Sequence, residues 1–197
     1  MALNDKNTIS IITPCTRINN LPIILSRIEN IGVATEWIIV YDENFVKEMD
    51  TKILMYPSVN TTIKLFLSDN DPSSGNAWRL RNIGIDNATG DYLYFLDDDT
   101  VPHPNLYYGV KNYLYKYDLI VFNQSRRGRT LKNDYFKHPH LIDTGQFLVA
   151  RNKTTKWGPS TDYREEREYF STLLGSISKD KIIYLQIPLS YYNHLSI

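Results

Sequence analysis

The 197-residue chain contains little cysteine and no long hydrophobic run. Cys15 is its only cysteine, so no disulfide can form within the chain and a reducing compartment is expected. No apolar stretch approaches the roughly 20 residues that span a bilayer, and segment 1–6 is too polar for a signal peptide. The sequence therefore predicts a cytoplasmic protein without a transmembrane segment.

An excess of charge of one sign is also missing. The 22 basic and 22 acidic residues cancel, so no nucleic-acid partner is expected. Basic density is confined to Ser-Arg-Arg-Gly-Arg at 125–129. The histidines lack metal-ligand spacing with the cysteine, which argues against zinc. The chain also lacks the G-x-S-x-G motif of serine hydrolases and the phosphate-binding motif G-x-x-x-x-G-K-[ST].

The first hundred residues alternate between strand and helix patterns. The expected strands are 8–13, 36–41, 62–67 and 92–96, and the expected helices are 21–30, 45–54 and 77–87. Strands separated by helices indicate βαβ units and a mainly parallel sheet. The less regular second half predicts helices at 104–115 and 162–174, strands at 118–123, 146–149 and 181–185, and a polar loop at 124–141.

The strongest chemical signal is the run Asp97-Asp98-Asp99 directly after an apolar strand. Adjacent carboxylates repel one another unless a cation lies among them. In an extended segment Asp97 and Asp99 leave one face while Asp98 points the other way, so that pair could hold a divalent ion and substrate phosphates. A solvated acidic turn is the simpler alternative. Parallel strands also bring segments 13–17 and 42–43 to the same edge of the sheet.

Three motifs follow one another in a set order. They are Arg-Asn-x-Gly-Ile at 81–85, Ala-x-Gly-Asp-Tyr at 88–92 and Phe-Leu-Asp-Asp-Asp at 95–99, preceded by Ile-Ile-Thr-Pro-Cys-Thr-Arg at 11–17. Together they resemble the nucleotide-sugar glycosyltransferases of the GT-A fold, family 2 in particular. The resemblance implies a Rossmann-like, mixed and mainly parallel α/β sheet flanked by helices in a single compact domain. Residues 1–105 would bind the nucleotide sugar, and residues 106–197 would form the acceptor-binding and catalytic half.

The resemblance also implies a set of site residues. The nucleotide-binding candidates are Thr13, Pro14, Thr16, Arg17, Asp42, Arg79, Arg81, Asp97 and Asp98. Asp99 and His194 would bind Mn²⁺ or Mg²⁺. The candidates beside the donor sugar or acceptor are Asp143, Thr144, Gly145, Gln146 and Trp157. Simpler interpretations are a solvated helix face for the two arginines, a strand terminator for Asp42 and an exposed terminal His194.

Catalysis would use a carboxylate base near the start of the last helix. The family commonly has Glu-Asp-Tyr there, and this chain has Thr161-Asp162-Tyr163. Asp162 is the first candidate base, although it also forms a capping box with Glu165. Glu165 is a second catalytic candidate, and Glu166 would be considered next. The implied reaction is an inverting transfer of a single sugar, from a UDP-sugar, to a hydroxyl of a glycan, protein or small molecule.

Other interpretations remain open on sequence alone. The pattern from Asp97 to Val101 also fits D-x-D-x-[TV] of haloacid-dehalogenase-like phosphotransferases. A nucleotide-sugar or carbohydrate-binding domain without turnover is a non-enzymatic alternative. The chain is also compatible with one module of a larger multidomain protein.

Overall fold

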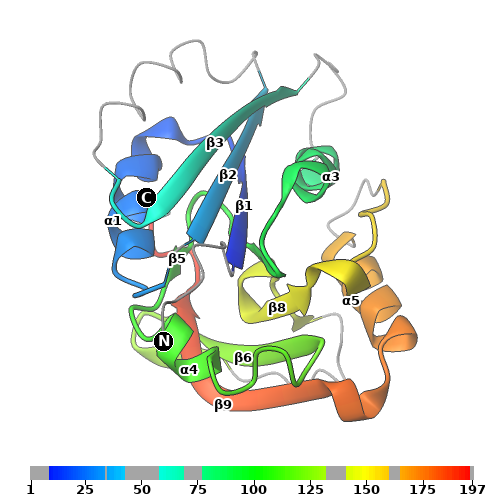
Figure 1. Cartoon of the computed structure of the whole chain (residues 1–197). Helices are drawn as coiled ribbons and strands as arrows, with labels where there is room; N and C mark the ends of the chain where they lie inside the picture. Colours follow the sequence, from blue (N-terminus) through cyan, green and yellow to red (C-terminus); the bar gives the residue numbers. More distant parts are fainter. Residues whose placement is uncertain are drawn as a thin grey trace.

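The computed structural model describes residues 9–33, 35–42, 58–68, 77–131, 141–159 and 165–195, and Figure 1 shows how their elements are arranged. The strands are β1 (Ile9–Cys15), β2 (Thr35–Asp42), β3 (Thr61–Ser68), β4 (Tyr92–Phe95), β5 (Val101–Pro102), β6 (Leu119–Arg126), β7 (Arg129–Leu131), β8 (Phe147–Ala150) and β9 (Ile182–Tyr191). The α-helices are α1 (Leu21–Glu29), α3 (Ala77–Asn87), α4 (Leu106–Val110) and α5 (Glu165–Ser176). Short 3₁₀ turns are η1 (Ile18–Asn20), η3 (Thr144–Gln146), η4 (Arg151–Lys153) and η5 (Lys179–Lys181).

One mixed sheet has the strand order β3-β2-β1-β4-β8-β6-β9-β5, with β7 paired to β6. The strands from β3 to β4 are parallel neighbours, as the βαβ pattern predicts. β8 is antiparallel to both β4 and β6, while β6 and β9 are parallel. The predicted mixed α/β domain, with a sheet flanked by helices, is confirmed.

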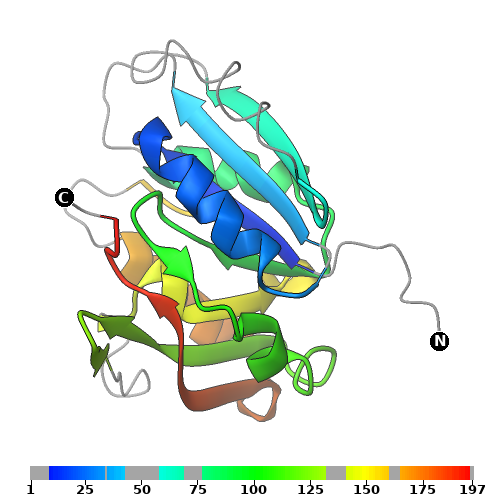
Figure 2. The same cartoon turned by 90° about the vertical axis from the view of Figure 1, so that its left-hand side faces the viewer.

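Both faces of β1, β2 and β4 are buried, which explains why these strands are almost continuously apolar, whereas β3 at the edge of the sheet is partly exposed. Ile9 and Ile11 of β1 face a core with α1 and α4, whereas Ile12 faces a second core with α3 and α5. On β4, alternate residues divide in the same way between the two cores. Figure 2 shows α1 lying across one face of these strands, with α3 behind them.

The hairpin formed by β6 and β7 corrects the sequence prediction of a loop over 124–141. β6 continues to Arg126 and pairs with β7 through Arg126 and Arg129. The two turn residues, Arg127 and Gly128, have φ of 47° and 76°, as tight two-residue hairpin turns require. Asn or Asp is the usual residue before such a glycine, so an arginine there gives no turn signal. Residues 132–140 lie outside the described ranges.

Two further expectations differ in length. The helix predicted over 104–115 is only the short α4, because the chain passes into turns and Tyr115 adopts a positive φ of 65°. β9 extends well beyond the predicted 181–185, since its second half pairs with β6 and β5. The helix predicted at 45–54 lies outside the described residues. Within the described ranges, no helix is both long and apolar enough to cross a membrane.

The contact of α3 with β1 gives a test of this packing. A Cβ at Gly84 would lie 2.3 Å from Cγ2 of Ile12, and the branched side chain of Ile12 is held in the core. We expect Gly84→Ala to lower the free energy of unfolding by about 1–3 kcal/mol through overpacking, measured by urea denaturation. Gly175→Ala on α5 is the matched control, because nothing lies within 4 Å of its added Cβ. Equal stability of the two variants would contradict the packing described here.

Candidate functional site

The acidic run forms a tight turn at the end of β4. Leu96 N donates to Ile12 O at 2.9 Å, which keeps the chain beside β1, and Thr100 N donates to Asp97 O at 3.0 Å to close the turn. The residues after Phe95 are therefore no longer in a strand. The alternation of side chains along a strand therefore does not decide where Asp97, Asp98 and Asp99 point. Each of the three carboxylates has different partners.

Asp98 binds the loop that follows β1. One carboxylate oxygen accepts from the backbone N–H groups of Thr16 and Arg17 at 2.6 and 2.7 Å, and the other accepts from Nη1 of Arg17 at 2.6 Å. The residue is buried, and its own carbonyl accepts from Nδ2 of Asn20. Asp98 thus fixes the position of the β1 loop relative to the acidic turn. Thr16 and Arg17 remain exposed at the surface of this loop.

Arg81 is a buried cation on α3, at the centre of the site. Its Nη2 donates to Asp97 Oδ1 at 2.9 Å, and its Nη1 lies 3.4 Å from Glu165 Oε1. Burial opposes its charge, but the nearby carboxylates, Asp97 first, outweigh that effect and raise the pKa of the guanidinium. Arg81 therefore joins α3 to the end of β4 and to the start of α5.

Trp157 covers this guanidinium. Cζ of Arg81 lies 4.5 Å from the Trp157 ring centroid, and Tyr169 of α5 stacks on the same indole at 3.9 Å. Asn82 holds the backbone of Trp157 through two hydrogen bonds, accepting from its N at 2.8 Å and donating to its O at 2.9 Å. Arg-Asn at 81–82 of the sequence motif thus positions both the acidic turn and the segment before α5.

Asp97 faces the second half of the chain as well as Arg81. Its Oδ2 accepts from Oγ1 of Thr144 at 3.3 Å, and its side chain is 32% exposed. It is therefore the contact between the end of β4 and the 3₁₀ turn η3.

Asp99 lies beside Arg17 and beside the end of the chain. Its Oδ2 is 3.3 Å from Nη1 of Arg17, and its side chain is 12% exposed. Leu195 N donates to Asp99 O at 2.9 Å, and Asn193 N donates to Oγ1 of Thr100 at 3.3 Å. The structure thus brings the segment that contains the exposed His194 against the acidic turn.

Asp143 begins η3 and is tied to β6. Its Oδ1 accepts from Gly145 N at 2.9 Å and from Nε2 of Gln124 at 2.7 Å, while Gln146 Oε1 accepts from Asp143 N at 3.0 Å. The pKa of the Asp143 carboxyl is raised, because burial and then the charge of Asp97 disfavour ionisation. The Asp-Thr-Gly-Gln segment is therefore held beside Asp97 by hydrogen bonds within η3 and to β6.

Two carboxyl groups at the start of α5 complete the cluster. Burial raises the pKa of Glu165, although Arg81 opposes the effect. Burial also raises the pKa of Glu166 to about 7, with Arg81 lowering it and the charges of Asp97, Asp143 and Glu165 raising it. A carboxyl group that titrates near neutral pH is suited to accept a proton in catalysis.

The cluster fits a metal ion that is shared with a substrate and does not fit an all-protein metal cage. Among the described residues, no group of three His, Cys, Asp or Glu side chains is arranged to hold a metal. Asp97 and Asp98 are bound to the protein's own donors as described above. Mg²⁺-like ions are often held by one or two carboxylates together with substrate phosphates. Asp99 could supply one such ligand.

Several predicted residues are placed less directly. Thr13 is fully buried and its Oγ1 accepts from Nε1 of Trp37 at 2.9 Å, and Pro14 is also buried. Arg79 is exposed, with its Cζ 5.0 Å from the Trp78 ring. Asp42 ends β2, but its side chain lies outside the described residues, as does Asp162.

Gln124 and Tyr192 belong to the site but were not predicted. Gln124 is fully buried and binds Asp143, and Tyr192 lies close enough to Asp143 and Asp99 for their charges to raise the pKa of its hydroxyl, after burial. Gln124 fell at the start of a predicted loop, so no pattern pointed to it. In the run Tyr191-Tyr192-Asn193-His194, the sequence pattern predicted a role for the histidine alone.

Comparison with known structures supports the fold. The crystal structure of S. aureus TarS 1–349 has a TM-score of 0.78 and 13% sequence identity over 93% of this chain and 60% of that chain. The same protein in complex with UDP-GlcNAc matches over 94% of this chain and 58% of that chain, with a TM-score of 0.78 and 12% identity. Glucosyl-3-phosphoglycerate synthase from Mycobacterium tuberculosis, with Mn²⁺, UDP-Glc and glycerol 3-phosphate, has a TM-score of 0.62 and 16% identity over 93% and 71% of the two chains.

The chain spans about 60% of the TarS fragment that it matches, and identities this low establish the fold alone. A search of curated proteins finds no match. The sequence model of the family described as Glycosyl transferase family 2 matches residues 76–178, more than half of the chain. The matched region contains α3, the acidic turn, η3 and the whole of α5. The chain therefore belongs to glycosyl transferase family 2 and has the GT-A fold.

Proposed function

We propose that this chain transfers a single sugar from a UDP-sugar to an acceptor hydroxyl, with inversion and with the help of Mn²⁺ or Mg²⁺. The observation that carries the proposal is the cluster of Asp97, Asp99, Arg81 and Glu166 at the carboxyl ends of β1 and β4. Ligands of open α/β sheets bind at that edge. The TarS structures contain UDP or UDP-GlcNAc, which supports the choice of donor.

The first half of the chain would bind the donor. The exposed loop at Thr16 and Arg17 is held by Asp98 and would border the nucleotide, with Asp97 beside the ribose. Asp99 would share the metal ion with the diphosphate, and His194 would add a ligand; the contacts of its neighbours Asn193 and Leu195 with the acidic turn support this role. A bound metal would neutralise the charge that grows on the departing nucleoside diphosphate. Residues 106–197 would then supply the acceptor and catalytic half.

Direct displacement needs a base for the acceptor proton. The acceptor oxygen bonds to the anomeric carbon as the bond to UDP breaks, and its proton passes to a carboxylate. Glu166 fits this role, because its pKa is about 7 and it lies near the charges of Arg81, Asp97 and Asp143. Glu165, bonded to Arg81, would position this end of α5. Asp162 remains the competing candidate from sequence.

The choice of base can be tested with two isosteric variants. We expect Glu166→Gln to bind UDP normally but to lose about 10²–10⁴-fold in sugar transfer, the usual contribution of a positioned base. Asp162→Asn should retain most of its activity. UDP release from UDP-GlcNAc and UDP-glucose, with Mn²⁺ and a panel of hydroxyl acceptors, is the measurement. An active Glu166→Gln beside an inactive Asp162→Asn would assign the base to Asp162.

The protonation of Glu166 also predicts a pH dependence of stability. Its pKa in the folded protein is raised from 4.5 to about 7, so the folded state holds a proton that the unfolded state has lost. The contribution of Glu166 to the free energy of unfolding is therefore fully present below about pH 4.5. It is lost as the pH rises toward 7.

Glu166→Gln should remove this fall in the free energy of unfolding between about pH 4.5 and pH 7. Relative to wild type, the variant should gain about 1–2 kcal/mol of unfolding free energy between pH 4 and pH 8, since partial exposure screens part of the effect. Urea denaturation at several pH values measures the difference. Glu168→Gln, exposed on the same helix, is the control and should follow the wild-type curve. Parallel curves for wild type and Glu166→Gln would show that Glu166 is ionised as usual.

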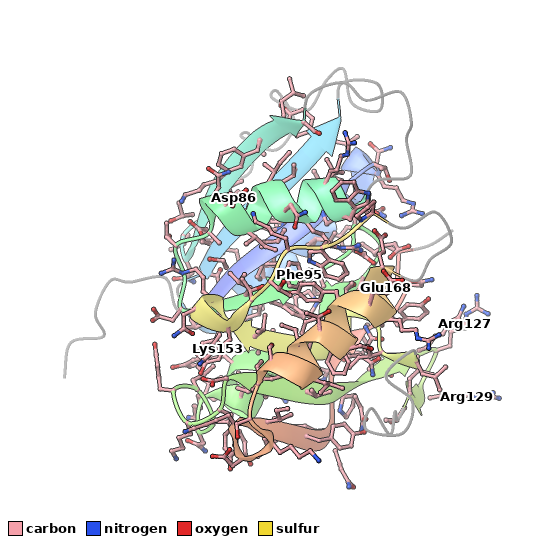
Figure 3. All side chains as sticks on the ribbon, turned by 90° about the vertical axis from the view of Figure 1, so that its right-hand side faces the viewer. Asp86, Phe95, Arg127, Arg129, Lys153 and Glu168 are labelled. Carbon is pink, nitrogen blue, oxygen red and sulfur yellow. The ribbon has the colours of Figure 1, made fainter. Side chains whose placement is uncertain are left out.

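Metal dependence gives a separate test. We expect UDP binding, followed by titration calorimetry, to weaken at least tenfold when EDTA replaces Mn²⁺, because the diphosphate and Asp99 would then repel each other. Asp99→Asn should bind UDP equally with and without Mn²⁺. Asp86→Asn is the control, because this exposed residue lies on α3 (Figure 3), and its carboxylate pairs with Lys156. Unchanged affinity of the wild type in EDTA would contradict a metal-bridged diphosphate.

Family membership removes the phosphotransferase alternative, because the matched region includes the D-x-D-x-V pattern itself. A binding domain without turnover would show UDP affinity but no UDP release in the same assays.

A further inference from the structure

The β6–β7 hairpin carries three arginines within four residues, namely Arg126, Arg127 and Arg129. All three are exposed. In Figure 3 the labelled Arg127 and Arg129 extend outward from the hairpin, on the same side of the view as Glu168 of α5. In a chain with no net charge, this is a local concentration of positive charge on the acceptor half.

The hairpin arginines are not neutralised by carboxylates of the described residues. No carboxylate forms an ion pair with them among the residues that the structure describes. Arg126 and Arg129 are direct cross-strand partners, so their side chains leave the same face of the hairpin. Like charges directly opposite each other destabilise a strand pair. An anion held between the two guanidinium groups would reverse that effect, since arginine forks match phosphate oxygens.

Tyr192 connects this arginine pair to the proposed reaction site. Tyr192 N donates to Ser125 O at 2.9 Å, and Cζ of Arg126 lies 5.2 Å from the Tyr192 ring centroid. Two of the residues that follow are bonded to the acidic turn, since Asn193 N donates to Oγ1 of Thr100 at 3.3 Å and Leu195 N donates to Asp99 O at 2.9 Å. The segment that carries this aromatic ring therefore joins the hairpin to the acidic turn.

We propose that the acceptor carries a phosphate group, bound between Arg126 and Arg129, while its hydroxyl reaches the acidic cluster past Tyr192. This inference rests on the proposed glycosyl transfer and names the chemical class of the acceptor. The carboxylates and the bound diphosphate of the donor would repel a further phosphate, so the phosphate end of the acceptor would lie at the hairpin and the neutral hydroxyl end at the site. The arginines thereby set both the class of acceptor and its direction.

The test uses glycerol 3-phosphate and glycerol as a matched pair of probes. Binding to the full chain is measured by titration calorimetry with Mn²⁺ and UDP present, and transfer is measured as UDP release from UDP-GlcNAc and UDP-glucose. We expect glycerol 3-phosphate to bind and react at least tenfold better than glycerol. Arg126→Gln/Arg129→Gln should lose that preference while binding UDP within twofold of wild type.

Two further variants separate charge from geometry. Arg126→Lys/Arg129→Lys keeps the charge without the planar fork, and it should retain only part of the preference. Arg27→Gln/Lys179→Gln removes the same charge from two exposed sites on α1 and η5, and it should behave as wild type. An equal loss in this control would mean that general electrostatics, not the hairpin, binds the probe.

Three results would overturn the inference. UDP binding without a preference for glycerol 3-phosphate in the wild type would refute it and leave the proposed function standing. Absence of UDP binding and release would remove the proposed function and the acceptor site with it. Retention of the protein on phosphatidylglycerol vesicles but not phosphatidylcholine vesicles, lost in Arg126→Gln/Arg129→Gln while glycerol 3-phosphate does not bind, would assign the arginines to a membrane surface.

Discussion

The ion pairs of the buried Arg81 are the interaction on which the site depends. An unpaired buried charge costs several kcal/mol, so α3 can place Arg81 in the interior only if carboxylates come to it. Asp97 arrives from the end of β4 and Glu165 from the start of α5. The same contacts that compensate the cation thus bring together segments more than 80 residues apart. Trp157 covers the guanidinium of Arg81, which is itself buried.

This arrangement gives the three adjacent aspartates different roles. Asp98 binds the loop after β1 through its hydrogen bonds. Asp97 binds both Arg81 and Thr144. Asp99 forms an ion pair with Arg17. Their mutual repulsion is reduced because the protein's own donors compensate them separately. Burial, and then the charges of Asp97, Asp143 and Glu165 against that of Arg81, raise the pKa of Glu166, which suits this carboxyl group to the role of base proposed for it.

Local patterns predicted the parallel half of the fold well. Alternating burial of β1 and β4 and the helical period of α3 are properties of neighbouring residues, and the motif order located Arg81 and Asp97–Asp99. The second half depends on long-range pairing: β8 is antiparallel between β4 and β6, and the end of β9 follows β6. Gln124 reaches Asp143 only because of that pairing. The hairpin was missed because Arg127 adopts a positive φ that arginine rarely takes.

In the proposed function, the acidic turn holds a nucleoside diphosphate through a divalent ion at Asp99. An anomalous difference map from crystals grown with Mn²⁺ and UDP tests it most directly. We expect one manganese peak in contact with the Asp99 carboxylate and both phosphates of UDP, with the ribose beside Asp97. A well-ordered UDP elsewhere, or no peak beside Asp99, would contradict it.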